Sequence, residues 1–312
     1  MTGRAHPVHG ERDRNFRLEV EETPGYLFKV HPPGERADVV DLQVKVLLRL
    51  EEADQPAPRA VVGTDGRHVQ IAELEGPQML RLNTWVDGAP YEDLPPLDAG
   101  QLRNLGGALA RLDDALAGLE HPAADHALLW DLQFPERLER ILPHVDPRVR
   151  PLAEETLRRH RLELAPALRG IPRQLIHNDA NPGNVLFTGD DVSGIIDFGD
   201  MVRGTRVQEL AVAGAYLYEG DGPYLESVAA LVGGYLRVAP LPWEQVALLP
   251  GLLRTRALLS LVITSWLADT AEHEAEERRA VLPRSVGRLE RFWNIEAEGG
   301  LERLRAAWEE AR

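Results

Sequence analysis

The sequence predicts an α+β protein with two lobes, a small β-rich N-terminal lobe and a larger, mostly helical C-terminal lobe. Up to residue 87, short apolar runs with strand-like alternation surround one helical stretch, whereas helical periodicity dominates after residue 100. The run Gly88-Ala89-Pro90 separates the two patterns. We therefore expect lobes of residues 1–87 and 88–312, with a cleft between them of the kind where small-molecule sites are usually built.

In the N-terminal lobe, the apolar pattern changes between strand and helix periods in the order β-β-α-β-β-β. This order predicts a small sheet that carries one helix. The expected elements are two strands within 15–31 around a turn at Thr23-Pro24-Gly25, a helix over 38–52, a hairpin over 59–76 that turns at Asp65-Gly66, and a strand over 79–88.

In the C-terminal lobe, amphipathic helices are expected over 101–119 and 148–168 and through most of the chain beyond residue 205. Only residues 174–200 interrupt this pattern, with two short apolar strands around polar turns. Proline and glycine indicate helix breaks near residues 223, 240, 250 and 283.

The composition excludes several classes of protein. The formal charge is −15 at pH 7, and a nucleic-acid binder needs a basic face, so nucleic acid is not an expected partner. The acidity favours solubility or, alternatively, an acidic cleft that attracts cationic substrates. No apolar run reaches the roughly 18 residues of a membrane span, and the N-terminus lacks the apolar core of a signal peptide. With no cysteine, thiolate chemistry is excluded. We expect a cytoplasmic protein without a membrane partner.

The stretch LIHNDANPGNVLF, residues 175–187, places many hydrogen-bonding side chains between two apolar edges. Asn, Asp, Gly and Pro are the residues of tight surface turns, so a turn is one explanation. A loop that presents a carboxylate and an amide to a ligand is the other. The spacing favours the second, since Asp179 follows His177 by two positions and Asn184 follows Asp179 by five. The run Asp197-Phe198-Gly199, which alone reads as an ordinary strand-ending turn, stands thirteen residues further on.

This spacing resembles the catalytic and metal loops of the protein-kinase superfold, H-x-D-x4-N followed by D-F-G. The resemblance implies that Asp179 orients and deprotonates an acceptor hydroxyl. It implies that Asn184 and Asp197 hold Mg²⁺, a cation that prefers oxygen ligands. By the same resemblance, ATP or GTP is the phosphate donor, and His177 braces the loop rather than acting on substrate.

The chain has only two lysines, Lys29 and Lys45. Lys29 lies in the apolar strand pattern YLFKV, where a charge needs a partner or a ligand, unless its stem reaches past an edge strand to solvent. In the superfold, a lysine at this place binds the nucleotide phosphates and pairs with a Glu on the next helix. Gln43 stands at that position here, so the partner of Lys29 is open between Asp41, Gln43 and Asp197.

Two other nucleotide contacts are implied by position in the fold. The phosphate-covering loop falls near Gly10, with Arg12 and Arg14 available to phosphates, although a solvated turn explains the arginines equally well. The base is expected against backbone groups of the strand that leads out of the N-terminal lobe, between Thr84 and Val86.

Protein kinases themselves carry H-R-D and A-P-E, and neither motif occurs here. The segment HNDANPGNVLF followed by SGIIDFGDMVRGTRVQELAVA instead resembles the aminoglycoside phosphotransferase and choline kinase family of small-molecule kinases. That family typically has H-G-D-x-H-x-x-N, then I-D-(W/F), a glycine and D-L-A. Gly204 matches the glycine, and residues 209–211, Glu-Leu-Ala, match D-L-A with one change. The likeness covers nearly the whole chain and is strongest over 174–211.

Within that family, three sequence features most resemble those of hydroxylysine kinase and its bacterial relatives. They are DRNF at 13–16, the predicted helix segment DLQVKVLLRL, and the pair D-A-N and IIDFGDM. The resemblance implies Mg²⁺-dependent transfer of the γ-phosphate of ATP or GTP to a hydroxylated amino acid. Homoserine, choline and antibiotic kinases are alternatives. A non-catalytic pseudokinase is a further one, supported only by Gln43 and the glycine-poor loop. Asp200 and Glu209 are candidates either to meet a substrate amine or to support the loops.

Overall fold

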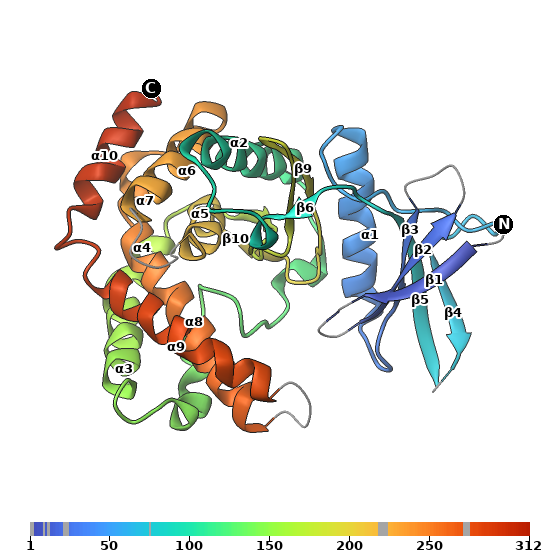
Figure 1. Ribbon diagram of the computed structural model, residues 1–312, viewed down its shortest axis with the longest axis horizontal. Coiled ribbons are helices and arrows are strands. Elements are labelled where there is room, and N and C mark those ends of the chain that lie inside the picture. The colour runs from blue at the N-terminus through green and yellow to red at the C-terminus, as the bar shows by residue number, and fades with distance from the viewer. Residues whose placement is uncertain are drawn as a thin grey trace.

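The computed structural model confirms a mixed α+β fold, with a β-sheet N-terminal region at one end and a helical C-terminal region at the other (Figure 1). Arg12 and the turn residues Thr23 and Pro24 lie outside the residues that the structure describes. The described residues are 3–8, 10, 13–20, 25–74, 76–217, 224–270 and 275–312.

The N-terminal sheet is antiparallel, with five strands in the order β1-β2-β3-β5-β4. The sequence predicted two strands ahead of the first helix, and the structure adds a third, β1, at the sheet edge. Its side chains are exposed along nearly the whole strand, so no apolar alternation marked it. The strands are β1 Gly3–Val8, β2 Arg14–Val20, β3 Tyr26–Val30, β4 Val69–Glu73 and β5 Pro77–Thr84.

The expected hairpin over 59–76 is wrong in its pairing. The segment 59–63 makes only an isolated bridge between Ala60 and Asn83, and β4 pairs with β5 instead. Strands β3 and β4 pair with the two edges of β5, so the segment 59–63 can pair only with the end of β5. The turn at Asp65-Gly66 does form, closed by a hydrogen bond from Gly63 N to Arg67 O.

Helix α1, Ala37–Glu52, is the helix predicted over 38–52. Its apolar positions recur every three or four residues and are buried, which is the pattern of a helix with one face against a core. Figure 1 shows α1 standing between the sheet and the helical region. Its most deeply buried apolar side chains are Val40, Leu42, Val46, Leu47 and Leu50.

Two small sheets hold the polar loops of the C-terminal region. Strand β7, Gln174–Ile176, pairs with β10, Val202–Gly204. Strand β8, Val185–Thr188, pairs with β9, Asp191–Ile195, and with the short β6, Ala89–Pro90, at the start of the C-terminal region. The loop 177–184 therefore runs from β7 to β8, and the loop 196–201 runs from β9 to β10. Paired strands thus fix both ends of each loop.

Helices form the rest of the C-terminal region, and the predicted helix over 148–168 is present as α3, a π-helical turn and α4. The expected break near residue 250 is present, because α7 ends at Val246 and α8 begins at Leu249 with Pro250 in its first turn, where proline is tolerated. The expected break near 283 is wrong, because Pro283 lies inside α9. The helices are α2 Ala99–Leu116, α3 Arg150–Arg159, α4 Ala165–Leu168, α5 Arg206–Ala215, α6 Tyr224–Val238, α7 Trp243–Val246, α8 Leu249–Thr270, α9 Ala275–Trp293 and α10 Gly300–Glu310, with 3₁₀ turns at Tyr91–Asp93, Pro122–Asp125 and Pro135–His144 and the π turn at His160–Leu164.

Helices α2 and α6 pack at very short distance. A Cβ at Gly106 would lie 2.0 Å from the carbonyl oxygen of Leu231, and one at Gly234 would lie 2.1 Å from that of Arg103. Both glycines are therefore required for this approach, since any side chain would push the helices apart.

By length and composition, one stretch of the described residues, Trp243–Thr270, is apolar enough to cross a membrane, although the composition predicted none. In the structure 89% of its most apolar window is buried within the protein. The stretch contains α8, the central helix of the C-terminal core, which accounts for its composition.

Candidate active site

His177 connects the two polar loops. Its Nε2 donates to the carbonyl oxygen of Ile196 at 2.9 Å, and its Nδ1 accepts from the backbone N–H of Asp179 at 3.2 Å. The ring lies edge-on to Phe198, with centroids 4.8 Å apart. Since one nitrogen donates and the other accepts, the geometry is that of a neutral imidazole. His177 is buried and braces Asp179 against the loop that carries Asp197.

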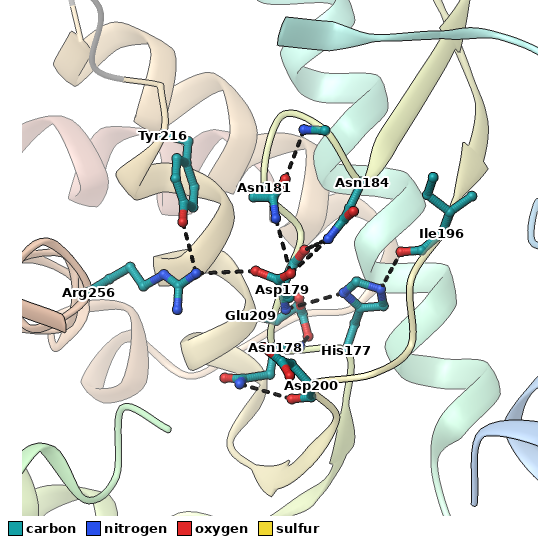
Figure 2. A network of polar contacts seen from close by, with 11 residues as sticks. His177, Asn178, Asp179, Asn181, Asn184, Ile196, Asp200, Glu209, Tyr216 and Arg256 are labelled. Carbon is teal, nitrogen blue, oxygen red and sulfur yellow. Dashed lines mark hydrogen bonds and ion pairs between the residues drawn. The ribbon is translucent and has the colours of Figure 1, made fainter. Parts of the chain in front are cut away.

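Asp179 is held from two sides (Figure 2). Its Oδ2 accepts from the side-chain amides of Asn184 at 2.8 Å and Asn181 at 3.0 Å. Its Oδ1 accepts from Nη2 of Arg256 at 3.2 Å. The Asp179 side chain remains 21% exposed, so a carboxylate of fixed orientation is accessible to a ligand. This is what a general base requires.

Asn178, between His177 and Asp179, adopts a left-handed backbone with φ of 64°, a conformation that Asn tolerates better than most residues. Its N–H donates to Oε2 of Glu209 at 3.0 Å, and its side-chain amide donates to the carbonyl oxygen of Asp200 at 3.1 Å. Glu209 is fully buried beneath the loop, and burial raises the pKa of its carboxyl. This burial favours Glu209 as a support for the loop over a contact with substrate.

Asn184 and Asp197 lie side by side, because Ile196 N donates to the carbonyl oxygen of Asn184 at 2.9 Å. Asp197 is 53% exposed and left-handed, with φ of 59°. Burial opposes ionisation of Asp197, but the charge of Lys29 outweighs it and lowers the pKa of the carboxyl. Among the described residues no cluster of three His, Cys or acidic side chains could hold a metal alone. Mg²⁺ needs fewer, because it keeps waters and binds phosphate oxygens, so this pair fits it.

Lys29 is buried between two carboxylates. Its Nζ lies 3.0 Å from Oδ2 of Asp13 and 3.5 Å from Oδ1 of Asp197. Of the partners that the sequence left open, Asp197 therefore pairs with Lys29. Asp41 does not, because it pairs with Lys45 at 2.7 Å. Asp13 was not predicted as a partner, and it is the closer of the two.

Gln43 does not contact Lys29 either. Its Oε1 accepts a hydrogen bond from Nη2 of Arg81, a buried residue that stands directly opposite Lys29 in the β3–β5 register. Burial lowers the pKa of Arg81 to about 10, against the opposing charges of Asp13 and Asp197. Nε and Nη1 of Arg81 are buried without a partner in the described structure. A second buried cation therefore stands beside Lys29 on the N-terminal sheet.

The structure also locates the other residues expected near the nucleotide, and their roles stay predictions. The N–H of Thr84 donates to Arg59 O at 2.9 Å, so Thr84 cannot offer this group to a base. The backbone of Val86 makes no hydrogen bond within the described residues, so it remains available. Arg14 donates to Gln78, whereas Gly10 packs so closely that a Cβ would lie 2.6 Å from Asp13 O. The single glycine of that loop is therefore required.

The sequence did not reveal four residues that contact the predicted site residues. Asn181 stands where the family pattern has a histidine. Asp13 belongs to the DRNF start, and the sequence alone assigns it no role. Only Arg256 could have been suspected from the sequence, because a charged residue inside the apolar run of α8 is costly to bury unless it is paired. The four are Asp13, Arg81, Asn181 and Arg256.

A fixed aspartate, a neighbouring amide and carboxylate, and a buried lysine on a two-lobed α+β fold are the arrangement expected of a phosphotransferase that acts on a hydroxyl group. Comparison with known proteins agrees. The model of the phosphotransferase enzyme family matches residues 4–241, and the chain belongs to that family. It is a small-molecule kinase, as the sequence resemblance predicted.

Individual relatives differ in acceptor. The chain is 25% identical to hydroxylysine kinase of Danio rerio over 308 residues, covering 93% of this chain and 86% of that protein. It is 32% identical to homoserine kinase of Rhizobium etli (strain CIAT 652) over 265 residues, covering 80% and 76%. A solved amicoumacin kinase in complex with AMP-PNP, Ca²⁺ and Ami superposes with a TM-score of 0.70 at 15% identity, covering 92% and 87%. The structural likeness shows the shared fold.

Proposed function

We propose that this protein transfers the γ-phosphate of ATP or GTP, with Mg²⁺, to the hydroxyl of a small hydroxylated amino acid in the cytoplasm. The observation that carries the proposal is the placement of Asp179. Its carboxylate lies between Asn184, which adjoins Asp197, and Arg256 on the opposite side. A hydroxyl bound at Asp179 is thus next to the place where the two oxygen ligands would hold a nucleotide phosphate.

The reaction needs no covalent step on the protein. The acceptor oxygen attacks the γ-phosphorus and passes its proton to Asp179, while the bond to the bridging oxygen breaks and its electron pair leaves on the nucleoside diphosphate. Asn181, Asn184 and Arg256 fix the carboxylate through hydrogen bonds. Most of the rate enhancement then comes from positioning and charge stabilisation.

On the nucleotide side, Asn184 and Asp197 would hold Mg²⁺, which when bound neutralises the negative charge on the phosphates. Lys29 adds a positive charge 3.5 Å from Asp197, and Arg81 stands beside it. Val86 offers backbone groups to the base. The solved relative that binds AMP-PNP and Ca²⁺ supports the use of a nucleotide with a divalent cation.

The two named relatives support an amino-acid acceptor, since hydroxylysine and homoserine are both amino acids that bear a hydroxyl. Choline and antibiotics such as aminoglycosides are the competing acceptors. A non-catalytic role receives little support from the sequence, because Asp179, Asn184 and Asp197 are all present.

A coupled assay that crosses ATP and GTP with hydroxylysine, homoserine, choline and kanamycin tests the proposal. The expected result is turnover of an amino acid with at least one nucleotide, abolished by chelation of the divalent cation. Turnover of kanamycin alone would refute the amino-acid acceptor but leave the kinase class intact. No phosphate transfer to any acceptor, with nucleotide still bound, would favour the pseudokinase.

A further inference from the structure

Two buried arginines lie against Tyr216, and one of them, Arg256, contacts the carboxylate oxygen of Asp179 that Asn184 does not contact. Arg256 of α8 is 1% exposed and Arg288 of α9 is 8% exposed. Their guanidinium carbons lie 5.5 Å and 4.7 Å from the ring centroid of Tyr216, and Arg256 also stacks 4.7 Å over Trp130. Arginine on aromatic faces is stabilised by cation–π attraction, so the rings orient both guanidinium groups.

The two arginines differ in their counter-charges. Nη2 of Arg256 donates to Asp179 and to the hydroxyl of Tyr216, at 3.2 Å and 2.9 Å (Figure 2). Arg288 makes no hydrogen bond or ion pair with any described residue, and its Nε is buried without a partner. Burial lowers the pKa of Arg288, and the charge of Arg256 lowers it further.

A buried positive charge without a counter-ion is strongly unfavourable. The chain as a whole carries a formal charge of −15, so a carboxylate partner for Arg288 was available in composition. Two arginines thus share one tyrosine ring, Arg256 contacts Asp179, and Arg288 has no counter-ion among the described residues.

We infer that Arg288, together with Arg256, binds the carboxylate of the acceptor and so holds the acceptor hydroxyl at Asp179. The inference rests on the proposed function and specifies its acceptor as a hydroxy acid. Arginine suits this role because its planar group matches a carboxylate in geometry and keeps its charge when buried.

The position of the pair separates the acceptor anion from the nucleotide. Arg256 contacts Oδ1 of Asp179, whereas Asn184 contacts Oδ2. The exposed Arg284 stands one turn before Arg288 on α9, and its charge acts on Arg288, so positive charge continues from the site to the surface. This arrangement attracts a carboxylate and repels polycations such as aminoglycosides, so it favours an acidic acceptor over the cationic substrates that an acidic cleft would attract.

The test compares homoserine with 3-amino-1-propanol, which is the same molecule without its carboxylate. In Arg288→Gln, the ratio of kcat/KM for homoserine to kcat/KM for 3-amino-1-propanol should fall by roughly 10- to 100-fold, mainly through the KM of homoserine. Arg288→Lys should restore part of the ratio, because it keeps the charge but loses the planar geometry. Hydroxylysine and its decarboxylated diamine provide a second pair.

Arg254→Gln is the matched control. Arg254 is buried on the same helix as Arg256 but pairs with Glu296 at 2.5 Å, so its loss should lower stability and leave the acceptor ratio unchanged. An unchanged ratio in Arg288→Gln would overturn the inference. So would a nucleotide KM that rises as much as the homoserine KM, which would make the bound anion a phosphate.

Calorimetric titration of homoserine and 3-amino-1-propanol into the protein with AMP-PNP and Mg²⁺ separates this inference from the proposed function. Tighter binding of homoserine that is lost in Arg288→Gln would support the carboxylate site even if no acceptor were phosphorylated. Turnover of both compounds without any carboxylate preference would refute the carboxylate site and leave the kinase assignment standing.

Discussion

The nucleotide side and the acceptor side of the site both contain buried cations, but they balance them differently. On the nucleotide side, Lys29 has two carboxylates of the protein, Asp13 and Asp197, within 3.5 Å. On the acceptor side, Arg256 has Asp179, whereas Arg288 has no carboxylate among the described residues. Among the described residues, Lys29 is therefore balanced by carboxylates of the protein, although Arg81 beside it has no ion-pair partner, whereas Arg288 has no such carboxylate. Under the proposals above, the nucleotide side would be preorganised by the protein, and the acceptor side would select for an anion that pairs with Arg288.

The largest effect of a substitution on activity is expected at Asp179, where the nucleotide side and the acceptor side meet. Asp179→Asn keeps the size of the side chain but removes the proton acceptor, so kcat should fall by about 10²- to 10⁴-fold. Nucleotide affinity should remain nearly intact, because Lys29, Asn184 and Asp197 are unchanged. Steady-state kinetics and calorimetry measure the two quantities. Asp191→Asn, an exposed residue of β9, is the control, and wild-type turnover in Asp179→Asn would contradict the assignment of the base.

The charge balance of the nucleotide side is tested by Asp13→Asn. Removing one partner of a buried ion pair should lower the free energy of unfolding at pH 7 by roughly 3 kcal/mol. Burial opposes ionisation of Asp13, but the hydrogen bond from His31 and the charge of Lys29 outweigh it and hold its pKa well below the ordinary value.

Because the folded-state pKa of Asp13 is depressed, its contribution to stability is present above the ordinary value near 3.9 and is lost as the pH falls through the depressed one. The difference between wild type and Asp13→Asn should therefore be largest at neutral pH and shrink in acid. Urea unfolding at a series of pH values measures it. A difference that grows towards acid would contradict the pairing.

The two lysines provide an internal comparison for nucleotide binding. Lys29→Met should lower kcat/KM for the nucleotide by roughly 10- to 100-fold, since a buried charge-assisted contact to phosphate is lost. Lys45→Met should have no such effect, because Lys45 is exposed on α1 and pairs with Asp41. Equal effects of the two variants would mean that Lys29 does not bind the phosphates.

The smallest effect of a substitution on activity is expected at Arg284, on the surface beside the acceptor side. Arg284 is exposed, so Arg284→Gln should lower kcat/KM for a carboxylate-bearing acceptor by only about two- to threefold, and salt should abolish the difference. Kinetics at low and high ionic strength measure it. A larger loss that persists at high salt would place Arg284 in direct contact with the acceptor.

The sequence predicted the parts of the site that are close together along the chain. Residues 177–184 and 197–199 carry their chemistry in their spacing, and the apolar strands on either side of each loop are recognisable by pattern. The fold class followed from the change of periodicity near residue 88. The lobe boundary at 87 and 88 stays a prediction, although Ser193 Oγ donates to Asp87 O at 2.9 Å and fastens the connection to the C-terminal region.

The sequence did not predict which side chains from distant segments of the chain become partners in the folded protein. The pairing of β3 with β5 places Arg81 beside Lys29, and α1 then offers Gln43 to Arg81 rather than to the lysine. Which of the many arginines is buried beside Asp179 depends on the packing of α8, 77 positions away in sequence. No local pattern contains this information, because strand register and helix packing are set by burial of the whole core.

By itself, then, the sequence determined the class of chemistry, since a carboxylate, an amide and a second carboxylate at fixed spacing in two loops are local properties of the chain. Only the tertiary structure decided which charges are balanced within the protein and which are not. Asp13 lies against Lys29 and Glu209 lies beneath Asn178, while no described carboxylate pairs with Arg288. The physical reason is that a buried charge depends on every group that folding brings within a few ångströms of it, and those groups come from segments far apart in the chain.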